Sequence, residues 1–254
     1  MNIIILTQSD PFYLAENIEY LITNLPSHSK LVGCVVFDVS PFGKSESFYQ
    51  KALKTIKIFG AKFFIYYTFK FFFNRLNKNK NVKNILIKHK VDIIPITGSI
   101  NSISSLELLK SYSPNLLISI AGNQIFKKDL IELAPLGCLN LHTALLPKYR
   151  GLMPSFWVLK NEEKYTGVSV FFVDEGIDSG PILVQKEIEI GKKTQEELIK
   201  VTKKLGMEAI IEAINKIEYG KYELIANNSQ EMTYFSFPKR EHVKEFYKKG
   251  NRFF

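Results

Sequence analysis

Three polar side chains, Asn140, His142 and Asp178, are of the types needed to move a proton while a carbonyl group is attacked. An amide N–H can donate to a carbonyl oxygen that becomes negatively charged. An imidazole, whose ordinary pKa is near ~6.5, can accept the proton of an attacking amine, and a carboxylate can orient the imidazole and stabilise its charged form. Because no Ser or Cys stands beside the histidine, these residues predict acyl transfer without a covalent intermediate on the protein.

The expected positions of these side chains follow from the segments around them. Asn140 and His142 are two residues apart at the end of an apolar run, 138–142, so in a strand they share one face. Asp178 follows a later apolar run, in a turn that contains glycine. Ligand sites of open α/β sheets lie outside the carboxyl ends of the strands, and such a turn could return the carboxylate to that crevice. Spacing alone leaves ordinary roles open as well: a hydrogen-bonded structural histidine and a turn-forming aspartate.

Apolar runs alternate with runs of helical spacing through the first two-thirds of the chain. The runs expected as strands are 2–6, 30–39, 91–96, 116–121 and 138–142, and those expected as helices are 13–25, 82–90 and 104–111. Such strands are typical of a parallel sheet covered on both faces. Two further runs, 167–173 and 182–190, are joined by a short segment that indicates antiparallel pairing. We therefore predict an α/β fold: an open, mostly parallel twisted sheet with helices on both faces and antiparallel strands near the C-terminal side.

We expect a catalytic domain at residues 1–218 and a short C-terminal extension at 219–254. The last helix of that domain, 194–217, is marked by Thr194 and Glu197, which have the spacing of a capping box. The extension holds a short extended piece and a basic terminal helix.

An aromatic-rich insertion at about 45–80 interrupts this alternation. Its centre reads IKIFGAKFFIYYTFKFFFNRL, and basic residues break it too often for a transmembrane span, which needs ~20 mostly uncharged residues. We expect a helical insertion that packs on the domain or forms the interface of a homo-oligomer, most simply a dimer. A helix that lies on a membrane surface through residues 55–76 is the alternative.

Composition adds weaker constraints. The formal net charge of +9 suits an anionic ligand, but scattered surface lysines explain it equally well. Cys34 and Cys138 stand in apolar runs and are expected to be buried free thiols. The absence of a C-x-x-C or His/Cys cluster predicts that no metal is bound. The first residues read as a strand rather than a signal peptide, so a cytoplasmic location is expected.

A series of motifs between about 115 and 190 resembles the folate-dependent formyltransferase family. The motifs are N-L-H, L-L-P-K-Y-R-G, G-V-S-V and D-E-G-I-D-S-G, in that order. The resemblance implies a Rossmann-like formyltransferase domain in which Asn140, His142 and Asp178 are the catalytic trio. It also implies 10-formyltetrahydrofolate as the formyl donor. The residues implied to bind this cosubstrate are Ala121, Gly122, Gln124, Ile125, Phe126, Val173, Asp174, Glu175 and Gly176.

The amine acceptor is less constrained. Arg150, Gly151, Pro154 and Trp157 resemble the pattern of the sugar N-formyltransferases and imply that they bind the acceptor, expected to be a nucleotide-linked amino sugar. Methionyl-tRNA formyltransferase activity is the alternative, although the 37 residues after 217 are too few for the additional barrel that those enzymes carry.

A formyltetrahydrofolate hydrolase and a non-catalytic binding module are weaker alternatives. The chain also departs from the family at Ala144, where a Ser is usual, and the loss of that hydroxyl could alter how the acceptor is handled. The turn after the first strand lacks a glycine-rich phosphate loop, which disfavours glycinamide ribonucleotide as acceptor. No G-x-G-x-x-G is present, which disfavours a dinucleotide-dependent oxidoreductase.

Overall fold

The structure is a computed structural model and describes residues 1–38, 47–220 and 222–254, with the side chain of Phe48 also outside the description. Residue 39 of the predicted strand 30–39, residues 45–46 of the predicted insertion and residue 221 of the predicted extension lie outside the described residues.

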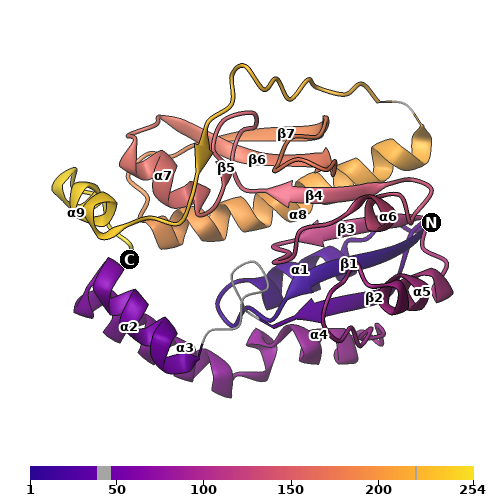
Figure 1. Cartoon of the computed structure of the whole chain (residues 1–254), viewed down its shortest axis with the longest axis horizontal. Coiled ribbons are helices and arrows are strands. Elements are labelled where there is room, and N and C mark those ends of the chain that lie inside the picture. The colour runs from indigo at the N-terminus through magenta and orange to yellow at the C-terminus, as the bar shows by residue number, and fades with distance from the viewer. Residues whose placement is uncertain (39–46, 221) are drawn as a thin grey trace.

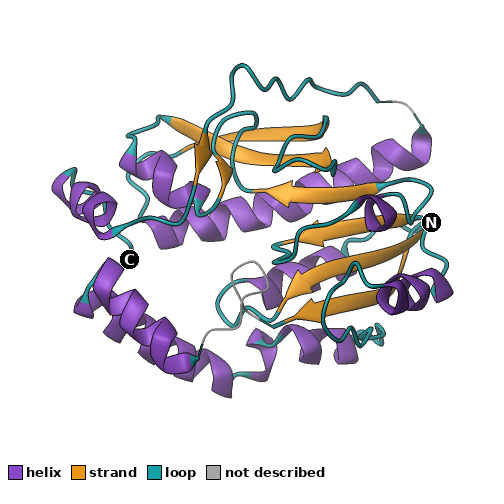
Figure 2. Cartoon of the chain, in the orientation of Figure 1, coloured by secondary structure: helices purple, strands orange, loops and turns teal. Residues whose placement is uncertain are grey.

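Six strands of the described chain form one sheet in the order β2-β1-β3-β4-β6-β7 (Figures 1 and 2). Their bounds are β1 Asn2–Gln8, β2 Lys30–Phe37, β3 Leu116–Ile120, β4 Cys138–His142, β6 Tyr165–Phe172 and β7 Ile182–Glu189. The first four of these are parallel, whereas β6 is antiparallel to β4 and β7 to β6. The predicted fold class is therefore confirmed.

Each face of the sheet is covered by a different set of helices. Along β1, Ile3 and Ile5 belong to one buried cluster and Ile4 and Leu6 to another, because successive side chains of a strand point to opposite faces. The first cluster packs against α1 (Leu14–Thr23), α4 (Val82–Lys88) and α8 (Gln195–Tyr219), and the second against α5 (Ile103–Ser111) and α6 (Lys128–Ile131).

Two local predictions are also confirmed. Helix α8 begins with the expected capping box, in which the Thr194 hydroxyl accepts from Glu197 N and Glu197 Oε2 accepts from Thr194 N. Cys34 and Cys138 are buried free thiols in different clusters, and burial raises the pKa of the Cys138 thiol to about 12. Such thiols act as small apolar side chains.

The predicted strand 91–96 is wrong in length. Only Ile93 forms a bridge, with Cys34 of β2, supported by Cys34 N donating to Asp92 O at 2.8 Å and Ile94 N to Cys34 O at 2.9 Å. Pro95 follows immediately and has no N–H to continue a ladder. The apolar run therefore ends as an isolated bridge at the sheet edge.

The segment expected as an aromatic-rich insertion contains α2 (Phe48–Phe59), α3 (Ala61–Leu76) and the 3₁₀ turn η2 (Lys78–Lys80). Gly60, with φ of 90°, separates the two α-helices. They lie at the lower left edge of the molecule in Figure 1. In the described ranges, no helix combines the length and the apolar character that a membrane crossing requires.

The C-terminal segment packs onto the sheet-bearing body. Strand β8 (Tyr234–Phe235) pairs with the short β5 (Arg150–Gly151), and α9 (Arg240–Lys248) follows it (Figure 1). Phe246 of α9 and Phe253 stack with Phe156 of α7 (Pro154–Lys160) in a third buried cluster. The expected boundary at 218/219 stays a prediction.

Candidate active site

Asn140 and His142 lie on β4, between β3 and β6, where Asn140 is opposite Ser119 and Phe171, and His142 is opposite Ser169. The Asn140 side chain is half-buried and makes no hydrogen bond with any described residue. A half-buried amide without a protein partner keeps both N–H groups available for a ligand. Its position at the carboxyl end of a parallel strand is where the sequence predicts a crevice.

The imidazole of His142 is held in one orientation. Nε2 lies 2.7 Å from the backbone carbonyl of Tyr149, and because a carbonyl only accepts, Nε2 carries a hydrogen. In neutral imidazole the other nitrogen, Nδ1, then has a free lone pair, and it lies 3.7 Å from Asp178 Oδ2. His142 is 7% exposed. Nδ1 can therefore take up a proton, and the resulting charge would lie beside the Asp178 carboxylate.

Asp178 is fixed by its neighbours rather than by His142. Its Oδ2 accepts from Gly151 N at 2.8 Å, and its backbone φ of 49° lies in the left-handed region that Asp tolerates better than most residues. The turn that carries Asp178 begins beside the start of β4, where Val173 N donates to Cys138 O at 2.7 Å. From there the turn runs along β4 and brings Asp178 to His142 at the end of the strand. His142 and Asp178 are thus brought together, with Asn140 on the strand between these two points.

Tyr149 contributes to the site through its backbone and was not singled out as a site residue by the sequence pattern. Its hydroxyl donates to Glu163 Oε1 at 2.5 Å and its ring stacks on Phe235 at 5.2 Å. Burial, followed by the bond to Glu163, raises the pKa of Tyr149 to about 12, so the hydroxyl stays protonated near neutral pH. A ring anchored at both ends holds the carbonyl that orients His142. The Tyr within L-L-P-K-Y-R-G was the available signal.

The four residues expected to bind the acceptor lie next to the C-terminal segment. Arg150 is 4% exposed and donates to Asn227 Oδ1 at 2.8 Å and Asn227 O at 3.2 Å. Trp157 is buried and donates from Nε1 to Ser236 O at 3.1 Å. Gly151 supplies the N–H that holds Asp178, and Pro154 is the first residue of α7. Arg150 and Trp157 therefore bind the tail of this chain, and a direct contact with the acceptor stays a prediction.

Asn227, which sequence reasoning missed, connects this anchor to the catalytic turn. Its Nδ2 donates to Asp178 O and to Gly180 O, both at 2.9 Å. Because Arg150 holds the same side chain by its oxygen, the amide cannot turn away. No periodic pattern marks residues 222–233, so only the three-dimensional structure reveals the contact.

The segment after β3 that is expected to bind folate adopts a strained turn. Ala121 has φ of 56°, and a Cβ on Gly122 would lie 2.8 Å from Ser119 Oγ. Gln124 accepts from Ile100 N at 2.9 Å, Phe126 is buried in the sheet's second cluster, and Ile125 is exposed. The backbone and the Ile125 side chain are the parts of this segment that remain open to a ligand.

The second expected folate segment opens the catalytic turn. Asp174, Glu175 and Gly176 are exposed, and Asp174 Oδ1 accepts from Gly176 N at 3.1 Å and from Ser179 Oγ at 2.5 Å. The Asp174 carboxylate therefore shapes the turn. Within the described ranges, no three His, Cys, Asp or Glu side chains are grouped closely enough to hold a metal ion.

Ala144 is fully buried, beside Tyr149 and Phe156 in the third cluster, and its carbonyl accepts from Ser169 Oγ at 2.8 Å. Its methyl group therefore lies in apolar surroundings. The effect of the missing hydroxyl on the acceptor stays a prediction.

Residues 75–214, more than half of the chain, match the protein family described as "Formyl transferase". The chain is 41% identical to the methionyl-tRNA formyltransferase of Kosmotoga olearia over 137 residues, which are 54% of this chain and 44% of that protein. The chain spans about half the length of the curated relatives it matches.

Solved structures share the fold at lower identity. The N-formyltransferase of Helicobacter canadensis, crystallised with folinic acid and dTDP-3-aminofucose, is 19% identical with a TM-score of 0.57, over 92% of this chain and 70% of that one. Glycinamide ribonucleotide transformylase 1 from Symbiobacterium toebii is 16% identical with a TM-score of 0.62, over 89% and 94%. At these identities the likeness shows the fold alone.

Proposed function

This chain belongs to the formyl transferase family, and on that basis we propose that it transfers a formyl group from 10-formyltetrahydrofolate to a primary amine. The observation that carries the proposal is the state of His142. Its Nε2 is committed to the Tyr149 carbonyl and its Nδ1 faces Asp178, and two residues earlier on β4 the Asn140 amide makes no hydrogen bond with any described residue. A base, a stabilising carboxylate and an oxyanion donor are the groups that this transfer needs.

The proposed reaction begins when the amine nitrogen attacks the formyl carbon. A C–N bond forms, the carbonyl oxygen becomes negatively charged, and the Asn140 amide donates to it. His142 Nδ1 takes the proton that the amine loses, and Asp178 stabilises the imidazolium. The oxyanion then collapses, the bond from the formyl carbon to N10 of the folate breaks, and N10 receives the proton from Nδ1. The products are the formamide and tetrahydrofolate, and His142 is neutral again.

The folate donor is supported by two observations. After β3, Ala121 with φ of 56° and Gly122, which has no side chain, form an irregular turn whose backbone a ligand can approach closely. The Helicobacter canadensis protein of the same fold was crystallised with folinic acid.

For the acceptor, we propose methionyl-tRNA first and a nucleotide-linked amino sugar second. The curated relatives at 41% and 46% identity are methionyl-tRNA formyltransferases. The hypothesis of an amino sugar acceptor rests on Arg150 and Trp157. The side chains of these two residues are already bound to Asn227 and Ser236 of the same chain. The hypothesis keeps the support of the Helicobacter canadensis protein, which was crystallised with dTDP-3-aminofucose.

The test is a matched assay of the full chain with 10-formyltetrahydrofolate and, in separate reactions, methionyl-tRNA, a panel of nucleotide-linked amino sugars, or no amine. Tetrahydrofolate release is followed by absorbance and the formamide product by mass spectrometry. We expect release to depend on the amine. Release at the same rate without any amine would show a hydrolase instead, and no release with any acceptor would contradict the proposal.

A further inference from the structure

Helix α3 carries a stripe of large apolar side chains on its outer face. The members recur at helical spacing and are Ile65 (53% exposed), Phe69 (62%), Phe72 (55%), Phe73 (71%) and Leu76 (83%). Helix α2 carries a second exposed series of the same spacing, Tyr49, Leu53 and Ile56. A contiguous exposed apolar face of this kind marks an interaction surface.

The opposite face of α3 is packed on the body of the protein. Phe63 lies 4.9 Å from Phe253, Tyr66 stacks on Phe254 at 3.8 Å, and Tyr67 meets Phe12 at 5.6 Å. Ile65 and Phe69 follow Phe63 and Tyr67 by two residues, roughly half a helical turn, and therefore point outward. The packed inner face therefore fixes the orientation of α3, with its apolar stripe exposed on the outside.

A partly buried ionic cluster fixes the inner face further. Lys70 Nζ lies 2.7 Å from Glu196 Oε1, and the Tyr66 hydroxyl donates to Glu196 Oε2 at 2.9 Å. Burial acts to raise the pKa of Glu196, but hydrogen bonds from Lys200, Lys70 and Tyr66 outweigh it, and the pKa is lowered. The carboxylate is therefore ionised at neutral pH, when it binds α3 to α8.

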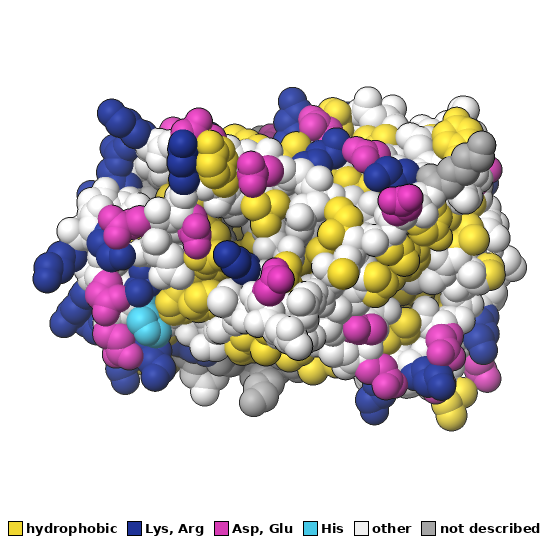
Figure 3. Space-filling model, turned by 90° about the horizontal axis from the view of Figure 1, so that it is seen from above, with side chains coloured by type: hydrophobic (Ala, Val, Ile, Leu, Met, Phe, Trp, Pro, Cys, Tyr) yellow, Lys and Arg dark blue, Asp and Glu magenta, His cyan; other side chains and the backbone are white. Residues whose placement is uncertain are grey.

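The positive charge of the chain is concentrated in the same segment. Residues 47–80 contain no Asp or Glu, and their basic residues are Lys51, Lys54, Lys57, Lys62, Lys70, Arg75, Lys78 and Lys80. These eight account for nearly all of the net charge of +9, which leaves +1 for the other residues. Figure 3 shows the top of the molecule as it is drawn in Figure 1, which is the side away from α3. On this face acidic and basic side chains are intermixed.

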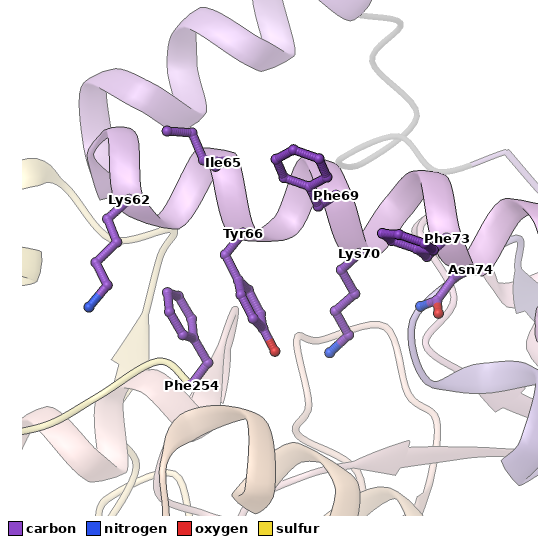
Figure 4. A pocket seen from close by; sticks show the side chains of 8 residues that line it. All are labelled: Lys62, Ile65, Tyr66, Phe69, Lys70, Phe73, Asn74 and Phe254. Atoms are coloured by element: carbon purple, nitrogen blue, oxygen red, sulfur yellow. The ribbon is translucent and has the colours of Figure 1, made fainter.

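An open groove of about 860 Å³ runs along α3. Figure 4 shows Lys62, Tyr66 and Lys70 extending from one side of the helix, with Phe254 beside Lys62 and Tyr66, while Ile65 and Phe69 lie on another side. Lys62 Nζ lies 5.6 Å from the centre of the Phe254 ring. The groove thus combines aromatic walls with the ammonium group of Lys62, which suits a ligand with an apolar chain and an anionic head.

From the stripe, the charge and the groove, we infer that the α2–α3 segment docks on an anionic lipid surface. The apolar stripe of α3 enters the boundary between headgroups and acyl chains, and the exposed side chains of Lys62, Arg75 and Lys78 beside it bind lipid phosphates. The 16-residue helix lies in the plane of the surface and does not cross it. The inference does not depend on which amine the protein formylates.

Two other occupants fit less well. In a symmetric dimer through this face, the same patch would meet itself. The segment holds eight basic residues and no acidic one, and although Lys70 and Lys80 pair with Glu196 and Glu16, the remaining positive charges would repel across the contact. RNA would use the cations and stack its bases on planar rings, but the aliphatic Ile65 and Leu76 offer no ring for a base.

The experiment is co-sedimentation of the full chain with vesicles of phosphatidylglycerol and phosphatidylcholine, compared with phosphatidylcholine alone. We expect the partition coefficient to be at least about tenfold higher on the anionic vesicles. It should fall in 0.5 M salt, where the Debye screening length is only ~4 Å. Phe69→Asp/Phe73→Asp should lower it at least about tenfold, whereas Ile103→Asp, a 77% exposed position on α5, should not. Arg75→Glu/Lys78→Glu should lower it more than Lys110→Glu/Lys192→Glu, which likewise reverses the charge at two exposed basic positions.

Three results would overturn the inference. The first is that the wild-type chain does not sediment with anionic vesicles. The second is that Phe69→Asp/Phe73→Asp and Ile103→Asp sediment equally. The third is that the wild-type chain is a dimer in vesicle-free solution and Phe69→Asp/Phe73→Asp makes it a monomer. Loss of tRNA binding in the same variant, with vesicle binding unchanged, would assign the face to RNA and also overturn it. Tetrahydrofolate release with a soluble amine is measured in parallel. It should match wild type in all of these variants, which separates this inference from the proposed formyl transfer.

Discussion

The side-chain amide of Asn227 donates to the backbone carbonyl of Asp178 at 2.9 Å, although 49 residues separate the two in the chain. A second bond from the same nitrogen goes to Gly180 O, so one amide holds both ends of the short turn that contains the proposed catalytic carboxylate. Residues after α8 therefore position a group that lies beside His142.

Asn227→Ala should lower turnover by roughly tenfold, with a loss of about 1–3 kcal/mol in stability, because the two carbonyls and Arg150 lose a partly buried hydrogen-bond partner. We expect the loss in kcat rather than in the KM of the folate donor. The matched control is Asn228→Ala, an exposed neighbour whose side chain bonds Gln230 N alone among the described residues. An equal effect of both substitutions on kcat would contradict a positioning role for Asn227.

His142→Ala and Asp178→Ala should each lower turnover at least ~10²-fold, the scale of general acid–base assistance. The double variant should be little worse than either single variant, because the carboxylate acts through the imidazole at 3.7 Å. His89→Ala, which removes a histidine that pairs with Glu19 at the surface, serves as the control. Turnover near wild type in either single variant would refute the mechanism.

Much of the fold was accessible from sequence because its signals are local. The β1 run is buried on both faces, so every residue from Ile3 to Leu6 is apolar, and the Thr194 capping box marks the start of α8 within four residues. The run 91–96 shows the limit of such signals. Its apolar residues match a strand, but Pro95 and an edge position reduce it to one bridge.

The site was accessible only in part. The short separation of Asn140 and His142 places both on β4, and the motif around Asp178 indicates its turn. The partner of Arg150 could not be predicted, because a buried arginine needs a partner and sequence does not show which one. Orientation of α3 was inaccessible for another reason: large apolar residues occur all round the helix, and Lys70 pairs with Glu196 of α8 while Phe69 and Phe73 are exposed.

Attachment of α3 should weaken in acid. The pKa of Glu196 is lowered in the folded protein, so its contribution to stability is present above the ordinary Glu value and is lost as pH falls through the lower folded value. Glu196→Gln should therefore lower Tm at pH 7 and make the acid limb of a plot of Tm against pH shallower. Glu218→Gln, at an exposed position of the same helix, should leave both unchanged. Parallel curves for wild type and Glu196→Gln would show that the carboxylate does not hold α3.

Gly151→Ala tests the junction where the C-terminal segment meets the catalytic turn. Gly151 has φ of 94°, its N–H holds Asp178 at 2.8 Å, and an added Cβ would lie 2.4 Å from Phe235 O. The methyl group must push β5 and β8 apart and move the donor of Asp178. We expect stability to fall by about 1–3 kcal/mol and turnover by at least roughly tenfold. The control is Gly250→Ala, because Gly250 has φ of 79° but no atom of the described residues within 4 Å of its Cβ position, so it carries the backbone strain without the collision. If both variants lose stability equally and Gly151→Ala keeps its turnover, the contact with Phe235 does not position Asp178.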